Sequence, residues 1–185
     1  GYCCRLLVPG GFMTQDEKRI VVVTGGSRGL GRVICQTFAD PGTHIYFNYH
    51  ASETGAQETG ELIAAAGGSW DAERVDISSF NMVSAWFKRI AATSQKIDIL
   101  VNNAGIAHIG NLENTSEADL DLLYSVNVKG VYNTLAAVIP SMKARKQGAI
   151  VNMASVASSV GIADRFAYSM TKGAVLTMTY SIAKD

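Results

Sequence analysis

The sequence predicts a doubly wound α/β fold, and three observations support that prediction. From Arg19 onward, short β-branched runs alternate with longer helical patterns, as parallel strands joined by crossover helices require. Several of the short runs are continuously apolar, which is typical of strands that are covered on both faces. The composition, 48% hydrophobic and 17% charged, fits one globular domain in a chain of 185 residues.

Five strands are expected, alternating with helices in the order βαβαβαβαβα. The strands cover residues 20–24, 44–49, 69–75, 97–102 and 149–153. Right-handed crossovers then give a Rossmann-type parallel sheet with the strand order 3-2-1-4-5. In such sheets, ligands bind beyond the carboxyl ends of the strands, so we expect the functional residues to follow the strands directly.

The helices between these strands have recognisable limits. They are expected from the Gly-rich turn to the breaker cluster at Asp40, over 53–66, over 80–94, and over about 117–146. The last of these contains Pro140, which has no backbone N–H to donate, so a kink or a break is expected near it.

Charge and cysteine content narrow the class of partner. Sixteen Lys+Arg balance 16 Asp+Glu, so nothing argues for nucleic acid or for an anionic membrane surface. No run reaches the ~20 apolar residues that span a bilayer. Cys3 and Cys4 are adjacent and Cys35 is distant, which fits neither a metal cluster nor a disulfide set. We therefore expect a small-molecule partner, no metal, and free thiols in a reducing cytoplasm.

The beginning of the chain is treated separately. Residues 1–12 contain no starting Met and no apolar run of signal-peptide length, whereas Met13 has the position of a natural start. We expect residues 1–12 to be a non-native extension. Residues 13–185 then form the one folded domain.

A Gly-rich turn, Thr24 to Gly31 (TGGSRGLG), joins the first strand to a helix. Backbone N–H groups and the helix dipole at such a turn can hold a pyrophosphate. Gly25 is free to take an unusual backbone turn, Gly29 allows phosphate to approach closely, and Gly31 permits tight packing of the helix on the strand. An ordinary strand-to-helix turn that happens to be Gly-rich is the alternative.

The end of the second strand bears on the choice of cofactor. An acidic residue there would bind a ribose 2′-OH and repel a 2′-phosphate, but Tyr49 and His50 occupy this place. Arg28 offers a cation to the same region, so NADP is favoured over NAD; a solvated surface charge is the alternative for Arg28. After the third strand, Asp76 can accept from an adenine amino group or form a local turn.

The fourth strand and the helix after it add further candidates. Asn103, Ala104 and Gly105 follow the strand, where a ribose or nicotinamide can lie against the backbone; a plain turn is the alternative. Asn127 interrupts an apolar helical stretch, which is unfavourable without a partner, so a water or a backbone group is expected to bind it. His108, between these two places, is interpreted as a loop histidine rather than a catalytic one.

A catalytic arrangement is predicted after the fifth strand. Ser155 follows the strand, and Tyr168 and Lys172 are four residues apart, so they lie on one face of a helix about 6 Å apart along its axis. Lowering a phenol pKa from about 10 by ~3 units needs roughly 4 kcal/mol, which a nearby ammonium and a cationic nicotinamide can supply together. Taken singly, these residues also fit a helix cap and a surface pair.

Five elements occur here in the order of the short-chain dehydrogenase/reductase family. They are TGGSRGLG from Thr24, NNAG from Asn102, Asn127, Ser155, and YSMTK from Tyr168. The chain resembles the family from residue 19 to residue 185. The resemblance implies reversible hydride transfer between NADP or NAD and a carbonyl or secondary alcohol of a small substrate, such as a 3-oxoacyl group, a sugar or a polyol.

The resemblance also implies a role for each residue. Tyr168 is the general acid or base, Ser155 holds the substrate oxygen, Lys172 favours the ionised phenol and binds the nicotinamide ribose, and Asn127 positions a water that relays protons. The residues assigned to the cofactor are Gly25, Ser27, Arg28, Gly29, Leu30, Gly31, Tyr49, His50, Asp76, Ile77, Asn103, Ala104, Gly105, Tyr168 and Lys172. The helices that carry Asn127 and Tyr168 are expected to pair in a homodimer or homotetramer.

The sequence departs from the family in length. Members usually run to about 250 residues and continue with two strands and a substrate-covering segment. The resemblance therefore implies a truncated reading frame or fragment, in which the fifth strand is an open edge that leaves Ile150 and Val151 poorly covered. Three hypotheses follow: an NADP-dependent carbonyl reductase or alcohol dehydrogenase, a nucleotide-binding sensor without turnover, and an inactive fragment. An NAD-dependent sugar or alcohol dehydrogenase stays open as a variant of the first.

Overall fold

The structure is a computed structural model that describes residues 18–184. Its five strands are β1 (Arg19–Val23), β2 (Thr43–Tyr49), β3 (Ser69–Arg74), β4 (Ile99–Asn102) and β5 (Ala149–Asn152). They form one parallel sheet in the order β3-β2-β1-β4-β5, which confirms the predicted topology. The predicted strand limits differ from the observed ones by one or two residues at several ends.

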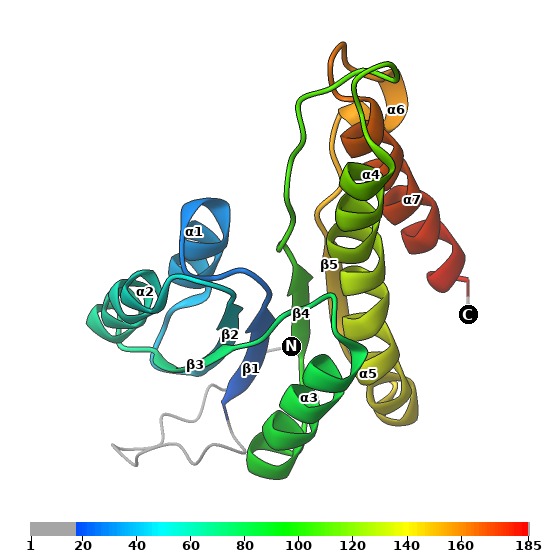
Figure 1. Ribbon diagram of the computed structural model, residues 1–185. Coiled ribbons are helices and arrows are strands. Elements are labelled where there is room, and N and C mark those ends of the chain that lie inside the picture. The colour runs from blue at the N-terminus through cyan, green and yellow to red at the C-terminus, as the bar shows by residue number, and fades with distance from the viewer. Residues whose placement is uncertain (1–17, 185) are drawn as a thin grey trace, which may run out of the picture.

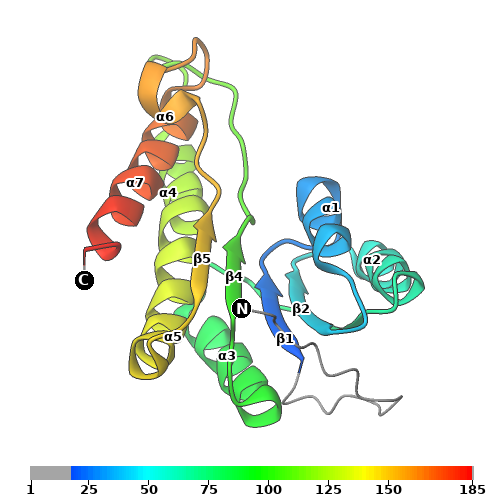
Figure 2. The same ribbon diagram turned by 180° about the vertical axis from the view of Figure 1, so that it is seen from behind.

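The helices cover both faces of the sheet (Figures 1 and 2). They are α1 (Gly29–Phe38), α2 (Glu53–Ala65), α3 (Phe80–Ser94), α4 (Glu117–Tyr124), α5 (Gly130–Arg145), α6 (Ala157–Val160) and α7 (Phe166–Ile182). On one face, Val21 and Val23 of β1 pack with Cys35 of α1 and Ile63 of α2. On the other, the alternate β1 residues pack against α3, α5 and α7. Strands β1, β2 and β4 are therefore buried on both faces, as their apolar runs predict.

The long fourth helix is interrupted at a different place from the one predicted. The α-helix α5 continues through Pro140, and the departure from α-helical geometry falls on a π-helical segment, Ser125–Lys129, between α4 and α5. The helix tolerates Pro140 because Ala136, whose carbonyl loses its hydrogen bond, is exposed and can be solvated. The π-helical segment contains Asn127, whose tertiary contacts are described below.

Strand β5 is an uncovered edge of the described sheet, as expected. Ile150 is half-buried and the Val151 side chain is 46% exposed. A cavity of about 440 Å³ lies beside the strand, lined by residues of α5, β5 and α7. None of the candidate site residues lines it, so this groove is separate from the predicted chemistry.

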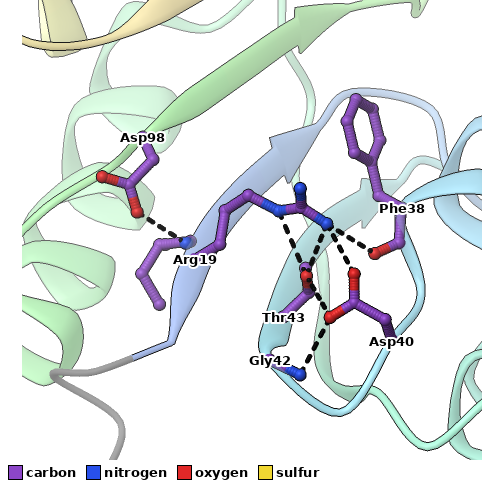
Figure 3. Close-up of polar contacts among 7 residues, drawn as sticks. Arg19, Phe38, Asp40, Gly42, Thr43 and Asp98 are labelled. Carbon is purple, nitrogen blue, oxygen red and sulfur yellow. Dashed lines mark hydrogen bonds and ion pairs between the residues drawn. The ribbon is translucent and has the colours of Figure 1, made fainter. Parts of the chain in front are cut away.

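Polar contacts fix the start of β1, at the end of the sheet opposite the candidate site (Figure 3). Arg19 donates to Thr43 Oγ1 and Asp40 Oδ2, at 2.8 and 2.7 Å from Nη2. Asp98 Oδ2 accepts from the Ile20 backbone N–H at 2.8 Å. These contacts join the first residues of β1 to the segments that precede β2 and β4. They therefore align the starts of these three neighbouring strands.

Several predictions concern features that the structure addresses only in part. Cys35 is buried and free, whereas Cys3, Cys4 and the proposed extension over 1–12 lie outside the described residues. Within residues 18–184, no helix has the length and apolar character needed to cross a membrane. The same residues contain no cluster of three or more His, Cys, Asp or Glu side chains placed to hold a metal ion.

Candidate active site

The Gly-rich turn is joined to the segment after β4 through Thr24. The Thr24 hydroxyl, which is 1% exposed, accepts from the backbone N–H groups of Asn103 and Ala104, each at 3.0 Å. In return, the Asn103 side-chain amide donates to the carbonyls of Thr24 and Gly25, at 2.9 and 3.3 Å. Two motifs that lie almost 80 residues apart therefore meet at one point on the carboxyl edge of the sheet.

The three glycines of the turn each meet a different steric requirement. Gly25 has a φ of +69° and Gly29 a φ of +54°, in the region that favours glycine. A Cβ on Gly31 would lie 2.1 Å from the Gly25 carbonyl oxygen and 2.6 Å from Asn103 Nδ2, so no side chain fits there. A Cβ on Gly29 would meet nothing within 4 Å, which leaves open space over the turn.

The N-terminus of α1 differs from those of α2, α3 and α4. These three helices begin with a serine whose side chain accepts from a first-turn N–H. The N-cap residue of α1 is Arg28, which makes no side-chain cap, and the first turn contains no acidic residue. Within residues 18–184, the first-turn N–H groups of α1 therefore have no side chain of the N-cap residue as a partner, and together with the positive end of the helix dipole they can bind an anion. Ser27 is buried beneath the turn, and Leu30 is exposed.

Asn48 connects the other side of the turn to the end of β3. Its side-chain oxygen accepts from the Gly25 N–H at 3.0 Å and its amide donates to the Val75 carbonyl at 2.8 Å. Asp76 follows directly, and its Oδ1 accepts from the N–H and the hydroxyl of Ser78, as in the predicted local turn. Thr24 and Asn48 were not among the predicted site residues, although both hold the turn in place.

Residues at the end of β2 lie close to this turn. Tyr49 is half-buried, and His50 and Arg28 are exposed. The backbone N–H of Gly26 donates to the carbonyl of Asn48 at 3.0 Å, so the turn rests on the last residues of β2. Near the end of β3, the Ile77 side chain is buried and its carbonyl accepts from Asn133 at 2.8 Å.

Lys172 and Tyr168 form the second half of the site, on α7. Lys172 is 6% exposed, and its Nζ lies 5.9 Å from the centroid of the Tyr168 ring. Nζ donates to the Met153 carbonyl at 2.6 Å. Burial lowers the pKa of Lys172, and no carboxylate among residues 18–184 forms an ion pair with it. The ammonium thus lies beside the Tyr168 ring and is bonded to the residue that follows β5.

Asn127 lies beside this lysine and is 1% exposed. Its side-chain oxygen accepts from the Ile106 N–H at 2.8 Å, and its amide donates to the Ile106 carbonyl at 2.9 Å and to Thr171 Oγ1 at 3.1 Å. The expected partner is therefore a backbone group. A Cβ on Gly105 would lie 3.1 Å from Asn127 Oδ1 and 3.5 Å from Lys172 Nζ, so these three residues are adjacent.

Ser155 occupies the loop between β5 and α6. Its Oγ accepts from the Ala157 N–H at 3.2 Å, which is a capping interaction for the short helix that packs against α7. Segments after β4 and β5 both run to the end of the molecule where α4, α6 and the start of α7 lie (Figure 1). They are joined there by backbone hydrogen bonds between Gly110 and the pair Asp164 and Phe166.

His108 lies in the β4 to α4 loop, as its interpretation as a loop histidine requires. Its Nδ1 is 4.0 Å from an Asp119 carboxylate oxygen. Its buried Nε2 has no hydrogen-bond partner among the described residues. The histidine thus packs beside the start of α4.

The chain has a parallel sheet with a Gly-rich turn after its first strand, and the helix that follows this turn has no side-chain cap. N–H groups that can bind an anion therefore lie at the carboxyl edge of the sheet. These features together define the class of nucleotide-binding α/β proteins. A family model for the short chain dehydrogenases matches residues 19–185, and the chain belongs to that family.

Three comparisons illustrate its relatives. An uncharacterized oxidoreductase of Thermotoga maritima is 37% identical over 91% of this chain and 66% of its own length. A 3-oxoacyl-acyl-carrier-protein reductase of Staphylococcus aureus is 34% identical over 89% and 67%. A crystal structure of a metagenomic short-chain oxidoreductase in complex with NADP matches with a TM-score of 0.86 and 31% identity, over 92% of this chain and 77% of that one. The chain spans about two thirds of the length of the curated relatives it matches.

Proposed function

We propose that this chain is an oxidoreductase that transfers a hydride between NADP(H) and a carbonyl or secondary alcohol of a small substrate. The observation that carries the proposal is the buried Lys172 ammonium beside the Tyr168 ring, which forms no ion pair with a carboxylate of residues 18–184. A cation and a phenol on one helix face form an arrangement in which the phenol can exchange a proton with a carbonyl oxygen. Relatives named as a 3-oxoacyl reductase and a cyclopentanol dehydrogenase interconvert these same functional groups.

The Gly-rich turn fits the cofactor. The uncapped start of α1 and the open space over Gly29 suit a pyrophosphate. Asp76 and Ile77 would contact the adenine, and Asn103, Ala104 and Gly105 would line the nicotinamide ribose. Arg28, together with Tyr49 and His50 in place of an acid after β2, favours a 2′-phosphate and hence NADP over NAD. When bound, the nicotinamide supplies or accepts the hydride.

The chain's own residues then handle the proton and the substrate oxygen. Tyr168 donates a proton to that oxygen during reduction and removes it during oxidation. Ser155 Oγ already accepts from Ala157, so its hydroxyl hydrogen is free to bind the same oxygen. Lys172 uses one of its three N–H donors on Met153 and keeps two for the cofactor ribose. Asn127 holds its segment beside Lys172, where we assign to it the positioning of a proton-relaying water.

The proposal extends to assembly and location. Leu122, Tyr124 and Tyr132 are large apolar side chains on α4 and α5, each about half exposed, and we propose that they are buried in a homodimer or homotetramer. The free, buried thiol of Cys35 suits a reducing compartment, and we propose the cytoplasm.

Replacing Tyr168 with Phe tests the mechanism. Removing the phenolic hydroxyl is expected to lower turnover of ketones and 3-oxoacyl thioesters at least ~100-fold, because a positioned acid contributes about 10²–10⁴ to the rate. The affinity for NADPH, followed by its fluorescence, should change less than about twofold, since the ring remains. Tyr180→Phe, on an exposed tyrosine of the same helix, is the matched control and should retain full activity.

Two outcomes would contradict this assignment. Wild-type turnover in Tyr168→Phe would exclude Tyr168 as the acid or base. Binding of NADPH without reduction of any member of a panel of ketones, 3-oxoacyl thioesters and sugars, both in this chain and in one extended to the length of its relatives, would favour a nucleotide sensor. Turnover in the extended chain alone would favour the inactive-fragment hypothesis.

A further inference from the structure

Arg74, the last residue of β3, lies across the carboxyl end of β2. It is paired in register with Tyr49, and its Nε donates to the carbonyl of His50 at 3.0 Å. The side chain is exposed, and its two terminal nitrogens have no hydrogen-bond partner among residues 18–184. The bond from Nε therefore orients the guanidinium while its outer N–H groups stay free.

Arg28, in the Gly-rich turn, lies next to a residue that contacts the start of α2. A Cβ on Gly55 would lie 2.7 Å from both the Ser27 carbonyl oxygen and Ser52 Oγ, so the Gly-rich turn abuts the first turn of α2. Arg28 follows Ser27 directly and is exposed, without a side-chain hydrogen bond. The two arginines thus flank the residues that connect β2 to α2.

Neither arginine forms an ion pair with an acid among residues 18–184. Glu73 is engaged by Arg89 in an ion pair, and Asp76 is held by Ser78 in the local turn. Glu53, in the first turn of α2, is the neighbouring acid that forms no ion pair within the described part of the chain. Arg28 and Arg74 are therefore the two cations beside the β2 to α2 connection that remain available to an anion.

We propose that Arg74 is a second determinant of the preference for a 2′-phosphorylated cofactor, acting together with Arg28; the inference rests on the proposed function. A guanidinium presents five N–H donors in a fixed fork, and with Nε bonded to His50 the outer nitrogens can bind two phosphate oxygens. Unlike Arg28, which lies in the Gly-rich turn near the pyrophosphate, Arg74 lies beyond β2. It therefore discriminates between the two cofactors without contributing to the binding they share.

Calorimetric titration of the 185-residue chain with adenosine 2′,5′-bisphosphate and with adenosine 5′-monophosphate tests the assignment. Arg74→Gln should weaken binding of the bisphosphate roughly 10-fold, the scale of one exposed charge-assisted contact, and change binding of the monophosphate less than twofold. Arg74→Lys, which keeps the charge and loses the fork, should fall between wild type and Arg74→Gln. Lys88→Gln, an exposed lysine of α3, removes the same charge away from the site and should alter neither affinity.

The outcomes distinguish the role of Arg74 from the proposed NADP-dependent function on which it rests. An unchanged affinity for the bisphosphate in Arg74→Gln, or an equal loss for both nucleotides, would overturn the role of Arg74 while leaving the NADP-dependent function intact. A wild-type chain that binds neither nucleotide would overturn the proposed cofactor and the role of Arg74 with it. In the double variant Arg28→Gln/Arg74→Gln, the two nucleotides should bind with nearly equal affinity.

Discussion

Gly31→Ala is the sharpest structural test of the candidate site. The added methyl group would lie 2.1 Å from the backbone oxygen of Gly25 and 2.6 Å from the Asn103 side-chain amide. Van der Waals contact needs a separation more than 1 Å greater, and the nearest atom belongs to the backbone, which cannot rotate away. Helix α1 must therefore move off the strand, or Asn103 must leave its place between the two motifs.

The expected loss of stability is about 3 kcal/mol. Overpacking costs about 1–3 kcal/mol, and displacing the Asn103 amide forfeits two hydrogen bonds of about 0.5–1.5 kcal/mol each. The higher helix propensity of alanine returns about 1 kcal/mol. With a urea dependence of roughly 2 kcal/mol per molar, the unfolding midpoint should fall by about 1.5 M.

Urea unfolding followed by the fluorescence of Trp70 and Trp86, the two tryptophans of the chain, measures this shift. Gly173→Ala, inside helix α7, is the matched control, because the added Cβ would lie 3.8 Å from the nearest heavy atom, the Ser158 carbonyl oxygen. That variant should be as stable as wild type or more so. Equal midpoints for Gly31→Ala and Gly173→Ala would refute the argument that the turn and the Asn103 segment are in contact.

Two further predictions concern buried polar groups. Burial lowers the pKa of His44 below its usual value near 6.5, so the unfolded chain takes up the proton at a higher pH than the folded chain does. The free energy of unfolding should therefore fall as the pH falls below about 6.5. In urea unfolding between pH 7 and 5, His44→Gln should lose less stability than wild type, and parallel curves for the two proteins would contradict this. Asn48→Ala should lower the free energy of unfolding by about 2–4 kcal/mol, because the Gly25 N–H and the Val75 carbonyl lose their partner. Asn81→Ala, on the exposed face of α3, is the control and should leave the urea midpoint unchanged. Equal midpoints for these two variants would show that Asn48 does not support the turn.

The strand order could be predicted because each strand is locally recognisable and right-handed crossovers leave few topologies. The partners of Thr24 and Asn48 could not, since they lie 79 and 23 residues away along the chain. A threonine after a strand is unremarkable until Asn103 and Ala104 are seen to donate to it. The sequence therefore predicts residues that are proposed to face a ligand, whereas the residues that hold the turn in place are recognised only in the structure.

The long helix illustrates a second limit. A π-helical turn adds about one residue to each turn and barely alters the apolar pattern, so Ser125–Lys129 could not be told from an ordinary helix. What selects the wider turn is tertiary: Asn127 binds Ile106 and Thr171, and the segment packs on α7. Conversely, Pro140 is the strongest local helix breaker of this segment, and yet the helix continues through it. The reason is that Ala136, whose carbonyl loses its hydrogen bond, lies on the exposed side of the helix, where water can bind that carbonyl.

The hydroxyl of Thr24 also constrains the order of events during folding. The first strand and its turn stand early in the chain, whereas Asn103 and Ala104, whose N–H groups donate to this hydroxyl, follow almost 80 residues later. Closing so long a loop is entropically costly and slow. The Gly-rich turn therefore reaches its final conformation only when β4 docks, and a nucleotide bound there, as proposed, would stabilise the assembled sheet rather than guide its early stages.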